Sequence, residues 1–471
     1  MRGNTFILGG VLTILVALCG GCQFGDTNID PINPTTATLE EVLPNAIVQT
    51  YRNINSIGGR VTGIVMQQLK GVDAQPLSYE QYLIDERTLD NLWRTGLYVG
   101  AMRDCDWLIK ETEKRTADQR YAAIARILLA HNLGLATSYW GDLPFTEAFA
   151  GDENLYPAYD PQELIYEQII LLLEQAVRDL EQAEFTGYLD ADLIFGGDAL
   201  SWRATAFSLL ARYSLHKSKR EANSTADVLT YLAEGAINDA EQQPTFNYLN
   251  NRNGGNPFAL YLEERAGQIV LGDFLMNLLQ TTADPRLHKI ARAEDDEYIL
   301  YDGESSDFFW TSLDTPIPLI SYAEVLFIEA EALLRNGEPS LAEEKMKAAV
   351  AAHCQQMEGG TDSEYQDWLQ STIHFDGCVD FECRLERLIQ QKYIALYVQG
   401  AHEAWNDYRR TGYPELSVPD NVNTSFNPSS VIPQRYLYPL NERTANLAAY
   451  QEAIDRQGGH FMDVSTWIFS D

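Results

Sequence analysis

A pair of helical patterns separated by a break occurs three times in the sequence. In each pair an Ala-rich segment with apolar residues at three-to-four spacing precedes a second segment with the same period. Small residues at the contacts let two such helices approach closely, as in tetratricopeptide hairpins. The three pairs are 118–140 with 160–183, 198–218 with 225–243, and 320–337 with 339–356. This pattern constrains much of the chain to packed helices.

The intervals between these pairs are long and rich in Gly, Asn, Pro and aromatic residues, so the pairs do not follow the period of about 34 residues of a regular array. We therefore predict an all-α fold in which tetratricopeptide-like helical hairpins form a scaffold with large inserted loops. Further helical periods cover 40–70, 88–113 and, as a last strong helix, 385–410. The longest irregular stretch is 245–317, where we expect a loop-rich insertion.

The N-terminus has the features of an export signal. A basic start at Arg2 is followed by an apolar run over residues 6–19. As a helix this run would be about 21 Å long, shorter than the ~30 Å hydrocarbon core of a membrane. Gly20 and Gly21 then precede Cys22, which predicts a lipoprotein signal over residues 1–21 with Cys22 as the lipidated residue.

The rest of the chain then divides into two parts. Residues 22–38 are polar and contain Pro, which predicts a lipidated tether, and 39–471 form a single helical domain. Cys19 and Cys22 also match a Cys-x-x-Cys redox or metal pair. A thiol pair in a segment about to be cleaved has no lasting role, so we prefer the processing site.

The chain carries a formal net charge of −34. Such acidity argues against nucleic-acid partners, since there is no basic surface to neutralise phosphates, and against electrostatic adhesion to anionic lipid. It also favours a neutral ligand over an anionic one. The acidic run 294–297 is a candidate for a structural calcium ion, against the alternative of a solvated loop; we predict no other cofactor.

Catalytic signatures are missing from the sequence. It contains no HExxH, no Gly-x-Ser-x-Gly and no phosphate-binding P-loop, and its seven His residues lack metal-ligand spacing. We therefore predict no enzyme activity, no catalytic residue and no metal ligand.

Four cysteines remain besides Cys22 and Cys19, and the sequence leaves their pairing open: Cys105, Cys354, Cys378 and Cys383.

Two loop regions have the composition of a sugar-binding surface. Aromatic faces stack on the C–H faces of pyranose rings, amides bind hydroxyl groups, and such groups are typically carried on loops. The candidate ligand-binding residues are Gln68, Tyr79, Tyr82, Asn253, Asn256, Phe308, Phe309 and Trp310. The alternative for each is packing on the scaffold, as most aromatic residues do.

Many ordered segments resemble the SusD/RagB-like nutrient-binding outer-membrane lipoproteins of Bacteroidetes. They include the Cys22 leader with NIDPINPT, and RYAAIARILLAHNLGLATSYWGDLPFTEAF (120–149). Others are IFGGDALSWRATAFSLLARYSL (194–215), TADPRL (282–287), PLISYAEVLFIEAEALLRNG (318–337) and YVQGAHEAWNDYRRTGYPEL (397–416). The resemblance covers nearly the whole chain.

The resemblance implies a function as well as a fold. Such a protein would be lipid-anchored in the outer membrane, exposed at the cell surface, and paired with a SusC-like TonB-dependent transporter. It would capture a nutrient, usually an oligosaccharide, and deliver it to that transporter. Binding of peptides or another nutrient, a lipoprotein glycoside hydrolase, and a purely structural scaffold are the alternatives.

Overall fold

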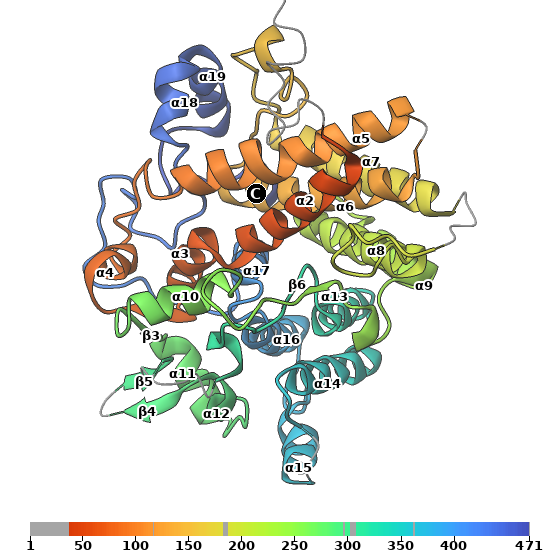
Figure 1. Cartoon of the computed structure of the whole chain (residues 1–471). Helices are drawn as coiled ribbons and strands as arrows, with labels where there is room; N and C mark the ends of the chain where they lie inside the picture. Colours follow the sequence, from red (N-terminus) through yellow and green to blue (C-terminus); the bar gives the residue numbers. More distant parts are fainter. Residues whose placement is uncertain are drawn as a thin grey trace, which may run out of the picture.

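The computed structural model describes residues 37–115, 117–181, 187–294, 297–301, 308–360 and 363–470. The predicted signal, Cys22 and most of the predicted tether lie outside these residues. Helices dominate the described chain, as predicted, and the strands are two or three residues long. Figure 1 shows the helices gathered in one body.

The three predicted helix pairs are present. They are α6 (Arg120–Trp140) with α7 (Gln162–Glu181), α8 (Ala199–His216) with α9 (Ser224–Gly235), and α13 (Tyr322–Arg335) with α14 (Pro339–Gln356). All of α6 is buried, and Figure 1 shows it in the middle of the helical layer. The second helix of the middle pair was predicted to extend to residue 243 but ends at Gly235. Gly235 has a φ of 129°, a conformation that favours glycine.

The remaining helices flank these pairs. The N-terminal ones are α2 (Leu39–Asn55), α3 (Ile57–Val65), α4 (Ala74–Glu80), the π-helical η2 (Leu92–Met102) and α5 (Arg103–Arg115). The C-terminal ones are α15 (Ser363–Thr372), α16 (Phe381–Ala395), α17 (Ala401–Thr411), α18 (Leu440–Ala445) and α19 (Leu447–Gln457). Short 3₁₀ turns are η3 (Gly151–Glu153), η4 (Lys217–Lys219), η5 (Ala240–Gln242), η6 (Phe309–Thr311) and η7 (Trp467–Phe469).

The predicted insertion at 245–317 is made of short elements. Its helices are α10 (Pro257–Glu264), α11 (Asp273–Thr281) and α12 (Leu287–Ile290). The antiparallel strand pairs are β1 (Leu69–Gly71) with β3 (Ile269–Leu271), β2 (Thr245–Phe246) with β6 (Ile317–Pro318), and β4 (Arg292–Glu294) with β5 (Glu297–Ile299). Pairing of β1 with β3 joins the insertion to the N-terminal helices. Figure 1 shows α11, α12, β4 and β5 together at one end of the molecule.

Two predicted helices are each broken in two. The period over 40–70 is interrupted at Ser56, because α3 turns tightly on α2: a Cβ on Gly59 would lie 2.5 Å from the carbonyl oxygen of Ile54. The period over 385–410 is interrupted at Val398, whose φ is 63°. There the Gln399 amide donates to the carbonyl oxygen of Ala395 at 2.6 Å and satisfies one of the last acceptors of α16. Neither of these two periods forms one continuous helix, and the period over 88–113 is also kinked, at Gly100.

Buried ion pairs and one histidine–carboxylate contact join the helices at the centre of the fold. Arg212 on α8 lies 2.6 Å from Glu324 on α13, and His216 on α8 lies 2.7 Å from Glu403 on α17. A second cluster connects α13, α16 and α17, with Arg410 2.6 Å from Glu331, and Asp407 2.8 Å from both Arg410 and Lys392. All these side chains are at most 4% exposed. The pairs therefore hold four helices in one arrangement.

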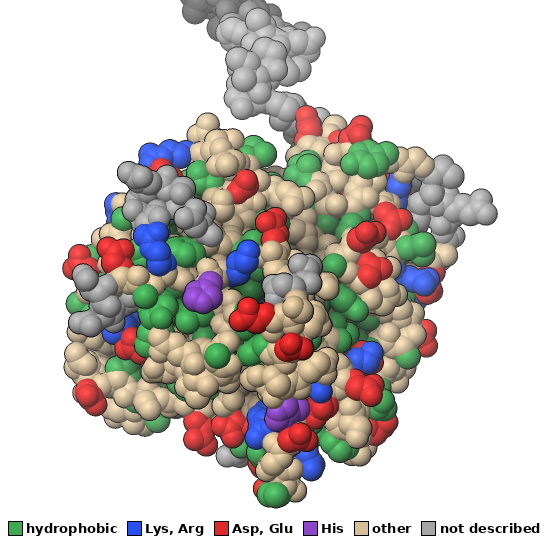
Figure 2. All heavy atoms as spheres, turned by 90° about the horizontal axis from the view of Figure 1, so that it is seen from below, with side chains coloured by type: hydrophobic (Ala, Val, Ile, Leu, Met, Phe, Trp, Pro, Cys, Tyr) green, Lys and Arg blue, Asp and Glu red, His purple; other side chains and the backbone are tan. Residues whose placement is uncertain are grey.

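The surface has a different character from this core. Figure 2 shows the face seen from below, where acidic side chains are spread over much of the surface, with basic and apolar side chains between them. No helix in the described ranges is long and apolar enough to cross a membrane. Among the same residues, no three His, Cys, Asp or Glu side chains form a group that could hold a metal ion. Asp295 and Asp296 of the candidate calcium loop lie outside the described residues.

We predict that His131 makes the fold acid-sensitive. It lies on α6, is fully buried, and neither ring nitrogen has a hydrogen-bond partner among the described residues. Burial, followed by the charge of Arg212, lowers its pKa well below the usual value. Below about pH 6.5 the unfolded state therefore binds a proton that the folded state does not. In that range the free energy of unfolding decreases by about 1.4 kcal/mol for each unit by which the pH is lowered.

His131→Leu should remove this dependence. Between pH 7.5 and 5, the wild type is expected to lose about 2 kcal/mol more of its free energy of unfolding than the variant does. Urea unfolding at the two pH values measures the difference. His288→Leu, at an exposed position, is the control and should follow the wild type. Equal losses for His131→Leu and the wild type would contradict the prediction.

Candidate functional site

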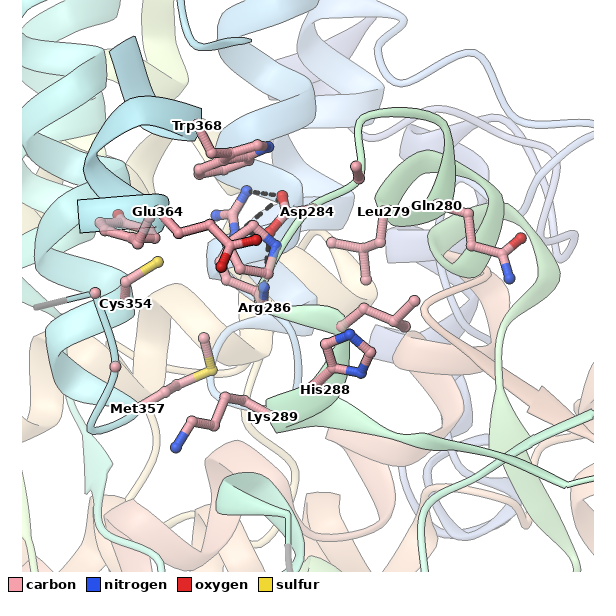
Figure 3. A pocket seen from close by; sticks show the side chains of 16 residues that line it. Leu279, Gln280, Asp284, Arg286, His288, Lys289, Cys354, Met357, Glu364 and Trp368 are labelled. Atoms are coloured by element: carbon pink, nitrogen blue, oxygen red, sulfur yellow. Dashed lines mark hydrogen bonds and ion pairs between the residues drawn. The ribbon is translucent and has the colours of Figure 1, made fainter. Parts of the chain in front are cut away.

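A cleft of about 560 Å³ opens between the α11–α12 segment and the end of α14 with α15. Ligand pockets are commonly on the order of 300–1,000 Å³, so the space suits a small ligand. Figure 3 shows Arg286 and Asp284 in the middle of the cleft, between Trp368 above and Met357 and Lys289 below. Charged, aromatic and apolar side chains therefore converge here from separate parts of the chain.

Local backbone geometry places the two sides of the cleft. After α11, Ala283 adopts a φ of 48°, and the turn leads through Asp284 into α12. On the other side, α14 is followed by Gly360 with a φ of 81°, where a Cβ would lie 2.9 Å from the Tyr365 ring. Glycine at this position thus lets α15 fold back beside the end of α14.

A buried ion pair forms the centre of the cleft. Arg286 donates from Nε to Asp284 Oδ1 at 2.9 Å and from Nη2 to Asp284 Oδ2 at 2.6 Å. Nη2 also donates to Oε1 of Gln391 on α16 at 2.5 Å. Burial alone would lower the pKa of Arg286, but the Asp284 carboxylate outweighs it and raises the pKa. The guanidinium therefore stays charged, with its charge balanced by Asp284.

Two aromatic residues line the cleft from α15. Trp368 is half-buried, and its Nε1 donates to the carbonyl oxygen of Thr282 at 2.9 Å. Its ring centroid lies 5.7 Å from Arg286 Cζ and 5.7 Å from the Tyr365 ring centroid. These contacts hold α15 against the turn between α11 and α12, and leave part of the Trp368 ring accessible at the cleft.

The remaining lining residues fall into two groups. Four buried side chains form what we call the apolar wall: Leu279, Leu287, Cys354 and Met357. Four exposed side chains form a polar rim: Gln280, His288, Lys289 and Glu364. Burial raises the pKa of the Cys354 thiol, so this free cysteine stays protonated at neutral pH and acts as an apolar group.

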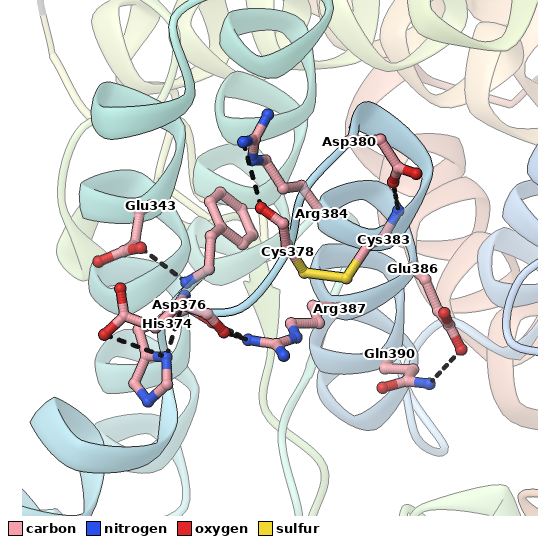
Figure 4. Close-up of a disulfide and its surroundings, with 11 residues drawn as sticks. Glu343, His374, Asp376, Cys378, Asp380, Cys383, Arg384, Glu386, Arg387 and Gln390 are labelled. Atoms are coloured by element: carbon pink, nitrogen blue, oxygen red, sulfur yellow. Dashed lines mark hydrogen bonds and ion pairs between the residues drawn. A yellow bond between two sulfur atoms is a disulfide. The ribbon is translucent and has the colours of Figure 1, made fainter.

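The disulfide-bonded loop after α15 supports this end of the molecule (Figure 4). Cys378 and Cys383 are bridged, which settles the pairing that the sequence left open, while Cys105 and Cys354 are free and buried. Asp380 Oδ1 accepts from the backbone N–H of Cys383 at 3.0 Å and caps α16. The start of α16 is thereby tied to the segment that follows α15. The same helix carries Gln391 near its other end.

Comparisons with known proteins agree with this architecture. A family model described as "Starch-binding associating with outer membrane" matches residues 31–439. The chain belongs to the SusD-like family. The family assignment confirms the resemblance drawn from the sequence.

Solved structures show the same SusD-like fold. A Bacteroidetes SusD-like protein, AC2a, is 23% identical, with 92% of this chain and 100% of that chain covered and a TM-score of 0.79. A chitin-binding protein is 21% identical, with 92% and 100% covered and a TM-score of 0.76. A SusD/RagB family protein from Bacteroides thetaiotaomicron is 22% identical, with 92% and 99% covered and a TM-score of 0.74. The sequence has no match among curated proteins.

The predicted aromatic cluster of this SusD-like chain lies behind the cleft. Trp310 is fully buried, with its ring centroid 4.8 Å from that of Phe309 and 6.2 Å from that of His353, which directly precedes Cys354. Phe308 is also buried, and Phe309 is half-buried. Of the two interpretations offered by the sequence, packing on the scaffold describes Trp310 and Phe308 in this conformation, so neither presents a ring to a ligand.

The other predicted ligand residues are mostly buried as well. Tyr79 and Tyr82 are 4% and 2% exposed, and the Gln68 amide donates to the carbonyl oxygen of Tyr393 at 2.8 Å. Asn256 caps α10, where its Oδ1 accepts from the backbone N–H of Phe258 at 2.9 Å. Asn253 is exposed but does not line the cleft. The structure therefore does not bring the eight candidates together as a binding surface.

A smaller hollow of about 330 Å³ is lined by residues adjacent to the predicted ligand residues Gln68 and Tyr79. Gln67, Lys70, Glu80 and Asp273 line it, together with Phe274. Lys70 and Asp273 form an ion pair of 2.9 Å across it. Lys70 and Asp273 bind each other at this hollow, whereas the cleft at Trp368 combines a half-buried aromatic ring with an exposed polar rim.

Sequence reasoning missed Tyr365 and Trp368. A usable signal was present, since the two aromatic residues are three positions apart on one face of a short helix that follows Gly359 and Gly360. Helical spacing gives their shared face but not the partner. The contact with Thr282, 86 positions away, depends on the tertiary fold.

We predict that Trp310 contributes mainly to stability. Trp310→Ala should lower the free energy of unfolding by about 3–5 kcal/mol, because a fully buried ring is removed and leaves a cavity. Chemical denaturation measures the loss. Trp107→Ala, at a half-buried ring beside Arg115, is the comparison and should lose less than half as much. A near-wild-type stability for Trp310→Ala would contradict burial of this ring.

Proposed function

We propose that this SusD-like protein is anchored to the outer membrane through lipid at Cys22, is exposed at the cell surface, and captures oligosaccharide in the cleft at Trp368. It then delivers the ligand to a SusC-like TonB-dependent transporter. Family membership over residues 31–439 supports outer-membrane nutrient binding. The family description names starch, and one protein of the same fold is a chitin-binding protein, so a polysaccharide-derived ligand is favoured.

The position of Trp368 is the observation that carries the choice of site. Trp368 is half-buried and lines the cleft, so it is fixed by packing at a place where a sugar could stack on it. Gln280, Lys289 and Glu364 surround the cleft with donors and acceptors for hydroxyl groups. One fixed aromatic face with a hydrated polar rim favours moderate affinity, which suits a protein that must release its ligand.

The carboxylates of the cleft favour binding over hydrolysis. Asp284 and Glu364 are its acidic lining residues. Glycosidases require two carboxyl groups placed on either side of the bond that is cleaved. Both oxygens of Asp284 accept from Arg286, so Asp284 is committed to the ion pair. Among the described lining residues, Glu364 is then the one carboxylate left for acid–base chemistry.

Trp368→Ala tests the binding site. Isothermal titration with four-unit oligosaccharides from starch and chitin should show binding to the wild type. The variant should bind about tenfold more weakly, since the stacking surface is lost. Trp467→Ala is a matched control, because Trp467 is also half-buried and lies 5.4 Å from an arginine, Arg220, outside the cleft. Unchanged affinity in Trp368→Ala would place the ligand elsewhere.

Cys22→Ala tests the anchor and the partner. We expect the wild type to fractionate with the outer membrane and to copurify in gentle detergent with a β-barrel transporter identified by mass spectrometry. The variant should appear in the soluble fraction, because lipid chains each add about 0.8 kcal/mol of membrane affinity per buried CH₂. Recovery of the wild type without a transporter, under conditions that keep a known barrel complex intact, would argue for a stand-alone binder.

A further inference from the structure

The apolar wall limits which sugars fit the cleft. Leu279 and Leu287 face the ligand space from one side, and Met357 and Cys354 from the other. A sugar that carries hydroxyl groups at every position would bury at least one of them against this wall without a partner. An unpaired buried hydroxyl costs about 1–3 kcal/mol, roughly 5- to 150-fold in affinity. A ligand with an apolar substituent at that place avoids the cost.

Arg286 provides a second constraint at the same cleft. Its Nε and Nη2 are used by Asp284 and Gln391, whereas Nη1 has no hydrogen-bond partner among the described residues. Buried donors are nearly always paired in folded proteins, so an acceptor from a ligand would be favourable here. Nη1 has almost no exposed surface, so binding would include a small side-chain movement in the cleft.

The charge of the cleft selects a neutral acceptor. Asp284 already balances the charge of Arg286 through two hydrogen bonds. A carboxylate or sulfate on the ligand would therefore meet a neutralised pair inside a protein with a formal net charge of −34. A carbonyl oxygen can accept from Nη1 without bringing in a further negative charge.

An acetamido group meets all three requirements, since it joins a methyl group and a carbonyl oxygen on one carbon and is uncharged. We propose that the ligand of this cleft contains 2-acetamido sugars, with the methyl group against the apolar wall and the carbonyl oxygen accepting from Arg286 Nη1. Trp368 then stacks on the ring of the same or the neighbouring sugar. The proposal rests on the proposed function, because it specifies the sugar that the same site binds.

A matched pair of ligands tests this proposal on the wild-type protein. The β-1,4-linked tetramers of N-acetylglucosamine and of glucose have the same linkage and length, are both neutral, and differ in the acetamido group. Isothermal titration should show the acetylated tetramer binding about tenfold more tightly or better. An N-acetylated tripeptide is included as a third ligand of similar chemistry.

The outcomes separate this proposal from the proposed function. If the glucose tetramer binds as tightly as the acetylated one, or more tightly, the acetamido proposal is overturned while oligosaccharide capture stands. If the tripeptide binds and neither sugar does, both are overturned in favour of peptide uptake. Absence of binding by all three, with the protein shown to be folded by circular dichroism, overturns the acetamido proposal, and oligosaccharide capture is overturned as well if the starch tetramer also fails to bind.

Met357→Gln tests the position of the methyl group. A polar side chain of similar volume in the apolar wall should lower the ratio of the two tetramer affinities about threefold or more toward one. The ratio is measured on one protein preparation, so a partial loss of folded protein affects both affinities equally. Trp467→Ala should keep the wild-type ratio. A wild-type ratio in Met357→Gln would show that the acetamido group does not contact this wall.

Discussion

The arrangement of the SusD-like core depends on charges that are buried in pairs. Arg212 with Glu324 and Arg410 with Glu331 join helices that are far apart in the sequence. Such pairs add little net stability relative to an apolar core, but removal of one partner leaves an uncompensated charge and costs about 3–5 kcal/mol. Alternative packings of α8, α13, α16 and α17 would separate at least one pair. The ionic contacts therefore select one helix arrangement, while the apolar stripes supply the driving force for packing.

The geometry of the cleft at Trp368 depends on this core. On α16, Lys392 pairs with Asp407 of the ionic cluster, and the preceding residue, Gln391, accepts from Arg286 in the cleft. The α13–α14 hairpin belongs to the same cluster through Glu331 and supplies Cys354 from its second helix. Gln391 and Lys392, which are neighbours on α16, thus connect the cleft directly to the ionic cluster of the core. Rigid placement of this kind keeps the cost of ordering the site low when a ligand binds.

Local features of the structure follow from residues close together in the sequence. Thr38 and Glu41 form the capping box of α2, and Asp198 caps α8 directly after the glycine turn at Gly196 and Gly197. Helical periods located the three hairpins because the apolar period of each helix lies within one continuous segment of the sequence. The breaks at Ser56 and Val398 were missed because both sides of each break keep an apolar period. Composition also suggested Trp310 as a ligand residue, but its burial behind His353 depends on a contact between residues 43 positions apart. Trp368 has the same side chain but lies on α15, and its place at the cleft depends on the tertiary contact with Thr282.

Under the proposed function, the acidic surface and the charge-balanced cleft would act on different stages of ligand capture. At long range, a net charge of −34 disfavours approach of polyanionic glycans and leaves the approach of neutral ones unaffected. At short range, the Asp284–Arg286 pair leaves one donor and no net charge, so selection depends on hydrogen bonding and on the fit to the apolar wall. Interactions of this type are individually modest, and the polar rim stays hydrated around the ligand. Under the proposed function, a site with these properties would discriminate between neutral sugars through one substituent and would keep dissociation fast enough for delivery, which strong ionic contacts would slow.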